Sequence, residues 1–100
     1  MAKTIMNSRK NECYLCRKLY GNDNYCETDE HHIFHGPNRS LSEHYGLKVY
    51  LCYGHHQYSK EAVHVNAEIN RMIQRDGQKA FEEKHPDLDF RAIFGRNYLE

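Results

Sequence analysis

The chain has 100 residues, and its fourteen basic and fourteen acidic side chains give a formal net charge of zero. This balance indicates neither a strongly basic nucleic-acid-binding protein nor an acidic one. Hydrophobic residues make up 39% of the chain and charged residues 28%, which excludes a disordered tail and indicates one folded domain. A chain this short buries only a modest core, so a bound metal would add stability.

Residues 1–11 are polar and show no hydrophobic periodicity, so we expect a flexible arm there. They lack the apolar run of a secretory signal, and no stretch of the chain approaches membrane-spanning length. We therefore expect a cytoplasmic, reducing location and no membrane partner. In that setting four cysteines favour zinc over disulfides.

The first half of the chain predicts a short β hairpin behind a cysteine knuckle. Cys13-Tyr-Leu-Cys16 has the spacing of a metal knuckle, and the following residues 20–25 favour a turn. A strand is expected around residues 25–31, and residues 39–46 should form a helical turn or a loop. Alternating apolar residues over 47–51 predict a second strand, which ends at Gly54.

The second half of the chain predicts helices. A helix should open at residues 59–62, and apolar side chains then recur at helical spacing over residues 65–81. Asn66 could act as a second cap, and Gly77 is a weak point that could divide the helix. His85-Pro86 should end it.

A last short helix should follow, capped by Asp87, with Leu88 on its apolar face and Gly95 at its end. The order of knuckle, strand, loop, strand and helices predicts a small α+β domain. Residues 13–64 would form its core, and residues 65–100 a helical appendage.

Two ligand pairs with identical spacing predict a structural zinc site. Cys13-x-x-Cys16 supplies one pair and Cys52-x-x-His55 the other. Structural zinc is tetrahedral and usually takes its four sulphur or nitrogen ligands as two close pairs. Cys26 is the alternative fourth ligand in place of His55; otherwise it is a small buried thiol.

With His55 assigned to zinc, His31, His32 and His56 remain for a second function. Adjacent strand residues face opposite sides, so one of His31 and His32 can bind a metal while the other faces substrate. On a helix starting near His56, Lys60 would lie about 40° around the axis and His64 about 80°. Lys60 would then suit a bound phosphate, whereas His64 would bind metal only if the helix broke.

The string CxxC, HHI and LCxxHH resembles the zinc-stapled HNH endonucleases of the His-Me finger (ββα-metal) superfamily. The phrases HGPNR, YGLKVYLC and IFGRNYL further resemble small phage-encoded proteins of this group. The resemblance covers Cys13 to about Lys60 and implies a ββα-metal core in an intracellular, phage- or prophage-encoded protein that acts on DNA.

By this resemblance His32 would be the general base, and His31 and His56 would bind a catalytic divalent ion. The implied ion is Mg²⁺ or Mn²⁺, with Ni²⁺ or Zn²⁺ as alternatives. The family's central Asn falls on Leu47 here, and Asn38 is a candidate substitute.

Basic side chains in the loop after the first histidine pair, and after the second pair, could contact a nucleic acid. Arg39 and Lys60 are the candidate phosphate contacts. The sequence thus favours a metal-dependent DNA endonuclease or nickase. The alternatives are a non-catalytic zinc-knuckle module that binds nucleic acid or protein, and a zinc-dependent hydrolase of a small molecule.

Overall fold

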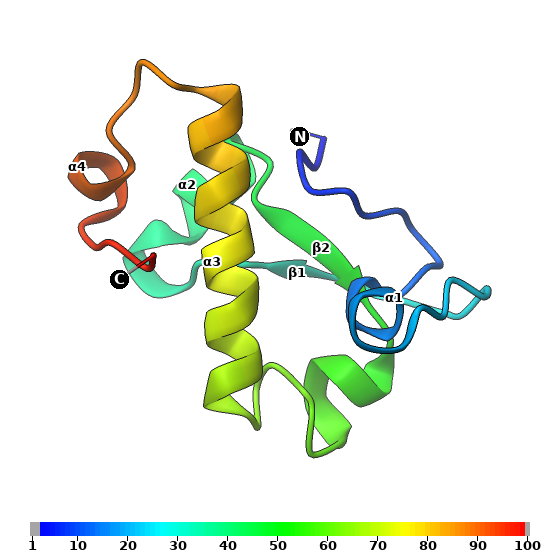
Figure 1. Ribbon diagram of the computed structural model, residues 1–100. Coiled ribbons are helices and arrows are strands. Elements are labelled where there is room, and N and C mark those ends of the chain that lie inside the picture. Colours follow the sequence, from blue (N-terminus) through cyan, green and yellow to red (C-terminus); the bar gives the residue numbers. More distant parts are fainter. Residues whose placement is uncertain (1–2, 100) are drawn as a thin grey trace.

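The computed structural model describes residues 3–99 and has the α+β fold class expected from the sequence, with a two-stranded sheet and surrounding helices (Figure 1). The elements in chain order are α1 (Tyr14–Tyr20), β1 (Asp29–His32), η1 (Gly36–Asn38), α2 (Arg39–His44), β2 (Lys48–Leu51), η2 (Gly54–Tyr58, one π-helical turn), α3 (Ala67–Lys84) and α4 (Phe90–Phe94). Within the described residues, no helix combines the length and apolar character needed to cross a bilayer.

The sheet is an antiparallel pair in which His31 lies opposite Val49 and His32 opposite Lys48. The pairing continues past β1, because the Ile33 amide donates to the Leu47 carbonyl at 3.0 Å. Successive side chains of a strand point to opposite faces. His31 and His32 are therefore directed to different sides of the sheet.

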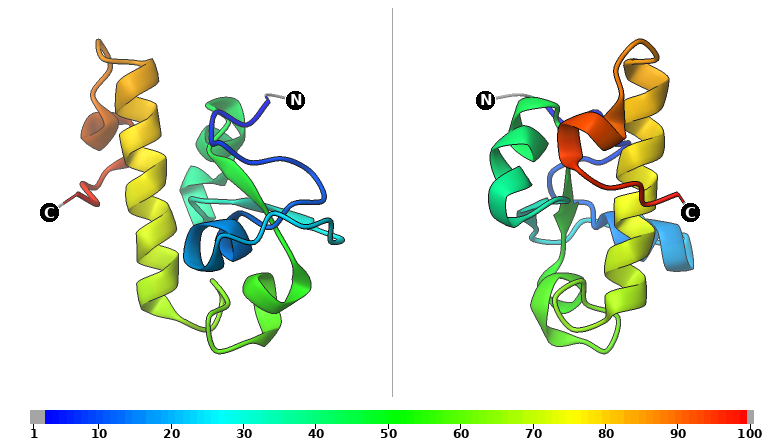
Figure 2. Two further views of the ribbon diagram at one scale, coloured as in Figure 1. Left: turned by 45° about the vertical axis from the view of Figure 1, so that its right-hand side comes forward. Right: turned by 90° about the vertical axis from the view of Figure 1, so that its left-hand side faces the viewer.

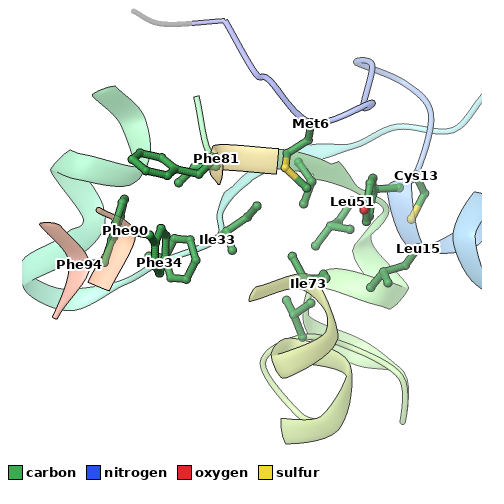
Figure 3. Close-up of a cluster of buried hydrophobic side chains, with 14 residues drawn as sticks. Met6, Cys13, Leu15, Ile33, Phe34, Leu51, Ile73, Phe81, Phe90 and Phe94 are labelled. Carbon is green, nitrogen blue, oxygen red and sulfur yellow. The ribbon is translucent and has the colours of Figure 1, made fainter. Parts of the chain in front are cut away.

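The helix α3 stands along one side of the sheet, with α4 beside its C-terminal half and η2 near its N-terminal end (Figure 1 and Figure 2). An aromatic cluster joins these parts, with Phe34, Phe81, Phe90 and Phe94 close together in Figure 3. The Phe34 ring centroid lies 5.4 Å from that of Phe90 and 5.0 Å from that of Phe94. The C-terminal helices thus share one core with the segment that follows His32.

The N-terminal segment is docked along β2 from residue 3 onward, which differs from the expected flexible arm. Met6 is buried in the core, and the Ile5 amide donates to the Gly46 carbonyl at 2.9 Å. Gly46 has φ +71°, and a Cβ there would lie 2.2 Å from the Lys3 carbonyl oxygen. The glycine therefore permits this close approach of two backbone segments.

The long helix begins later than the sequence pattern predicts. Residues 59–65 form turns, and α3 starts at Ala67, so the expected helix start at 59–62 is wrong. The cap is Asn66, whose side-chain oxygen accepts hydrogen bonds from the Glu68 and Ile69 amides at 3.0 and 3.1 Å. This cap satisfies two amides that a helix leaves without partners, which explains why the helix starts there.

The expected break at Gly77 is also wrong, because α3 runs unbroken through it to Lys84. The last helix is capped by Asp89 instead of Asp87, and Leu88 is left outside it and 38% exposed. The reason is a turn after the long helix, in which the Leu88 amide donates to the His85 carbonyl at 3.0 Å. Gly95 ends α4 with φ +83°, as expected.

Candidate metal centres

The two ligand pairs predicted for zinc lie together and can hold a metal ion. The Nδ1 atom of His55 is 3.5 Å from the sulphur of Cys13, 3.3 Å from that of Cys16 and 3.5 Å from that of Cys52. The sulphurs of Cys16 and Cys52 are 3.9 Å apart. Tetrahedral zinc, with bonds of about 2.0–2.3 Å, separates its ligands by roughly 3.5–3.8 Å. The four donor atoms therefore have the spacing of a tetrahedral site.

The start of α1 and the segment from β2 to η2 direct these four side chains toward one another. Cys13 is the N-cap of α1, and its sulphur accepts a hydrogen bond from the Cys16 amide at 3.4 Å, so the knuckle opens a helix. Cys52 follows β2, and η2 returns His55 toward it. Burial, with neighbouring thiols adding to it, raises the pKa of Cys16, so a bound cation would be needed to keep this thiol deprotonated. Cys26, the alternative ligand, lies outside the cluster.

A carboxylate stands behind His55. The Nε2 atom of His55 is 3.7 Å from the Glu61 carboxylate, which also accepts a hydrogen bond from the Tyr20 hydroxyl. A partner on the far nitrogen of a ligating histidine fixes its ring orientation and tautomer. Glu61 lies on the Nε2 side of the ring, beyond hydrogen-bonding distance, and the Nδ1 atom of His55 faces the three sulphurs.

A second cluster contains three imidazoles. Donor atoms of His31, His56 and His64 all lie within 4.8 Å of one another. The Nε2 atoms of His56 and His64 are 3.1 Å apart. His31 is 2% exposed, and its Nε2 atom has no hydrogen-bond partner within residues 3–99. Burial, together with the charges of neighbouring histidines, lowers the pKa of His31 to about 3. A metal ion binds neutral imidazole, and the unpartnered Nε2 atom of His31 is therefore a suitable ligand.

The fold delivers these histidines from three different segments. His31 lies on β1, His56 on η2, and His64 in the turns before α3, where its amide donates to the His56 carbonyl at 3.4 Å. The sequence pattern favours an ordinary histidine at His64, because a continuous helix would turn it away. The chain instead folds back between the two residues. Asp29 lies 3.4 Å from Nδ1 of His56 without a hydrogen bond to it, and the Nε2 atom of His56 faces that of His64.

His32 is not among these three imidazoles. Its Nε2 atom lies 2.8 Å from the Glu43 carboxylate and 4.0 Å from that of Glu30. Its charge is among the causes that lower the pKa of His31 and of His35. His32 follows His31 on β1, so the predicted base and this predicted ligand are adjacent in the chain, while their side chains face opposite sides of the sheet.

His35 completes the surroundings of the cluster, and sequence reasoning did not select it. Its ring centroid lies 4.9 Å from that of His31 and 5.8 Å from that of His64. The signal was the third histidine in HHIFH. Burial, with the charges of His64 and other neighbours including Arg39, lowers the pKa of His35. Arg39 is exposed at the start of α2, and Lys60 is exposed in the turn after η2.

Ser42 links the segment after β1 to the start of β2 by two hydrogen bonds. Its hydroxyl accepts a hydrogen bond from the Phe34 amide at 3.3 Å and donates to the Leu47 carbonyl at 2.5 Å. Asn38, the candidate substitute for the family's central Asn, instead donates to the Phe94 carbonyl at 2.9 Å and so anchors α4. Ser42 is fully buried, and its isolated position in the sequence gave no signal of this role.

No family model, curated protein or solved structure matches this chain. The functional interpretation therefore depends on the geometry of the two clusters.

Proposed function

We propose that the protein is a metal-dependent phosphodiester hydrolase, a DNA endonuclease or nickase with a ββα-metal core. The observation that carries the proposal is the convergence of His31, His56 and His64 around a buried, unpartnered imidazole nitrogen. The antiparallel strands β1 and β2, with the turn η2 directly after them, support the proposal.

The cysteine cluster fits a structural zinc. Its four donors, three sulphurs and the Nδ1 atom of His55, fill a tetrahedron and leave no position for water. The three-histidine cluster fits a catalytic ion, because three protein ligands leave positions for water and a phosphate oxygen. When bound, such an ion stabilises the negative charge that develops on the phosphate and on the leaving oxygen.

The ligands of the three-histidine cluster indicate which metal ion it prefers. The sequence pattern implies two histidine ligands and hence Mg²⁺ or Mn²⁺. The addition of His64 makes the set rich in imidazole. Imidazole suits zinc and nickel, whereas Mg²⁺ prefers oxygen ligands. We therefore infer that Ni²⁺ or Zn²⁺ supports the activity better than Mg²⁺ does.

The side chains around the ion have separate roles in the proposed reaction. His32 takes a proton from the attacking water through Nδ1, because its Nε2 atom is occupied by Glu43. Arg39, on the exposed start of α2, holds a phosphate oxygen of the substrate. Lys60 contributes a second phosphate contact further along the chain.

Plasmid cleavage tests the proposal. Supercoiled DNA is incubated with the protein and Mg²⁺, Mn²⁺, Ni²⁺ or Zn²⁺, and His32→Ala is compared with wild type. We expect the substitution to slow cleavage roughly 100-fold or more, which is the usual contribution of a general base. His44→Ala is the matched control, because His44 is an exposed histidine on α2.

Metal analysis separates the proposal from its main alternative. We expect one tightly held zinc and one chelator-exchangeable ion per chain. Unchanged cleavage by His32→Ala would remove His32 from the mechanism. One zinc alone, with no cleavage of DNA or RNA under any of these ions, would leave the non-catalytic zinc-binding module as the function.

A further inference from the structure

A buried lysine lies beside the proposed base. The Lys48 side chain is 3% exposed, and its Nζ atom lies 3.0 Å from both carboxylate oxygens of Glu43 and 3.4 Å from Glu30. Burial would lower the pKa of Lys48, but the hydrogen bond to Glu43 and the two carboxylate charges raise it above its ordinary value. Lys48 is thus a fixed positive charge held between two carboxylates.

The two carboxylates differ in their relation to His32. Glu43 has an oxygen 2.8 Å from Nε2 of His32, which is hydrogen-bonding distance, whereas Glu30 is no closer than 4.0 Å. Lys48 holds both oxygens of Glu43, so that carboxylate has little freedom to turn. The sheet register explains the arrangement, because His32 and Lys48 are directly paired across the two strands.

This group also has the composition of a metal site, since donor atoms of Glu30, His32 and Glu43 lie within 4.8 Å of one another. Lys48 argues against that role. Its ammonium group already forms salt bridges with both carboxylates, and a metal ion there would have to displace a lysine that is almost fully buried. The group is better explained as a support for His32.

We propose that Glu43 is a positioning residue that sets the tautomer of His32. A neutral imidazole has one N–H donor and one acceptor nitrogen, and the hydrogen bond that one nitrogen makes decides which is which. Glu43 accepts the Nε2–H of His32, so Nδ1 becomes the acceptor. The salt bridge from Lys48 keeps Glu43 in that position, and Glu30 forms a second salt bridge with Lys48. The inference rests on the proposed function, in which Nδ1 of His32 takes the proton.

Two alanine substitutions form a matched test. Glu43→Ala and Glu30→Ala each remove one carboxylate from Lys48, but only the first removes the hydrogen bond to His32. The tautomer is read directly from the imidazole ¹⁵N shifts of His32 in labelled protein at neutral pH. We expect the Nε2–H form in wild type and in Glu30→Ala, and a mixture of both tautomers in Glu43→Ala.

Cleavage kinetics supply the second measurement. We expect Glu43→Ala to lower kcat roughly 10- to 100-fold, as losing a partner behind a functional histidine typically does, with KM nearly unchanged. Glu30→Ala should lower kcat less than about threefold. Glu43→Gln should recover much of the loss, because its amide oxygen can still accept from Nε2–H. It also serves as the test variant if Glu43→Ala does not fold.

The outcomes are distinct. An unchanged His32 tautomer in Glu43→Ala, or equal losses of kcat in the two alanine variants, would overturn the inference. If Glu43→Ala does not fold, a Glu43→Gln protein whose His32 favours Nδ1–H would overturn it. If the wild-type protein cleaves no substrate, the proposed function fails, but the ¹⁵N measurement still decides whether Glu43 sets the tautomer.

Discussion

His55 and His56 are consecutive residues whose imidazoles belong to two different clusters. Nδ1 of His55 lies 3.3–3.5 Å from three cysteine sulphurs, whereas Nε2 of His56 lies 3.1 Å from that of His64. Successive side chains of a helical turn point in different directions, so the single turn η2 can serve two sites. The shared peptide means that a metal in the cysteine cluster would also fix the backbone of the imidazole cluster.

Removing one cysteine ligand should therefore disturb both clusters. We expect Cys52→Ser to lose the tightly held zinc and to lower Tm by more than about 10 °C, because structural zinc contributes directly to folding free energy. Elemental analysis and thermal unfolding monitored by circular dichroism are the measurements. Cys26→Ser is the control, since Cys26 lies outside the cluster. A Cys52→Ser protein that keeps zinc and its melting temperature would contradict the assignment.

Removing His64 should affect the second centre alone. We expect His64→Ala to weaken binding of Ni²⁺ or Mn²⁺ roughly 100-fold, because one of three imidazole donors is lost. The tightly held zinc should remain, since His64 is not among its ligands. Calorimetric titration of the chelator-treated protein measures the affinity, with His44→Ala as the reference. Equal affinities in the two variants would exclude His64 as a ligand.

Acid should destabilise the protein when the imidazole cluster is free of metal. The pKa of His31 falls from 6.5 to about 3 on folding, so between these values the unfolded chain binds a proton that the folded chain does not. The free energy of unfolding is therefore highest above pH 6.5 and decreases as the pH falls toward 3. The pKa shift of His31 corresponds to a decrease of at most about 5 kcal/mol.

Urea unfolding at several pH values, with His31→Gln as the comparison, measures this dependence. The variant lacks the titrating group, so its free energy of unfolding should change less between pH 6.5 and pH 4. Equal pH dependence in the two proteins would show that His31 titrates normally in the folded state.

Gly77→Ala should destabilise the protein although alanine is the better helix former. A Cβ at this position would lie 3.2 Å from the Ile33 side chain and 3.3 Å from Phe34, and both neighbours are buried. Crowding of about 1–3 kcal/mol should outweigh the helix gain of about 1 kcal/mol and lower Tm by several degrees. Ile33→Val in the same protein should restore part of the loss. A rise in Tm for Gly77→Ala alone would refute the close contact.

Local patterns predicted much of the fold because they depend on neighbouring residues. Apolar alternation over 47–51 predicted β2, and Gly95 predicted the end of α4. The start of α3 was misplaced because the sequence offers two caps. Ser59 accepts a hydrogen bond from the Glu61 amide but opens only a turn, whereas Asn66 accepts from two amides and opens the helix. Gly77 looked like a helix breaker, but its role is a contact between distant segments, which composition does not reveal.

The sequence by itself determined the two ligand pairs, Cys13-x-x-Cys16 and Cys52-x-x-His55, because each pair is local in the chain, but it left Cys26 open in place of His55. The tertiary structure brought the two pairs together and left Cys26 outside. Only the tertiary structure decided how the remaining histidines divide. The two faces of β1 separate His31 from His32, and the fold-back after η2 brings His64 to His56. Spacing along the chain is fixed by covalent geometry, whereas these approaches depend on how strands and turns pack.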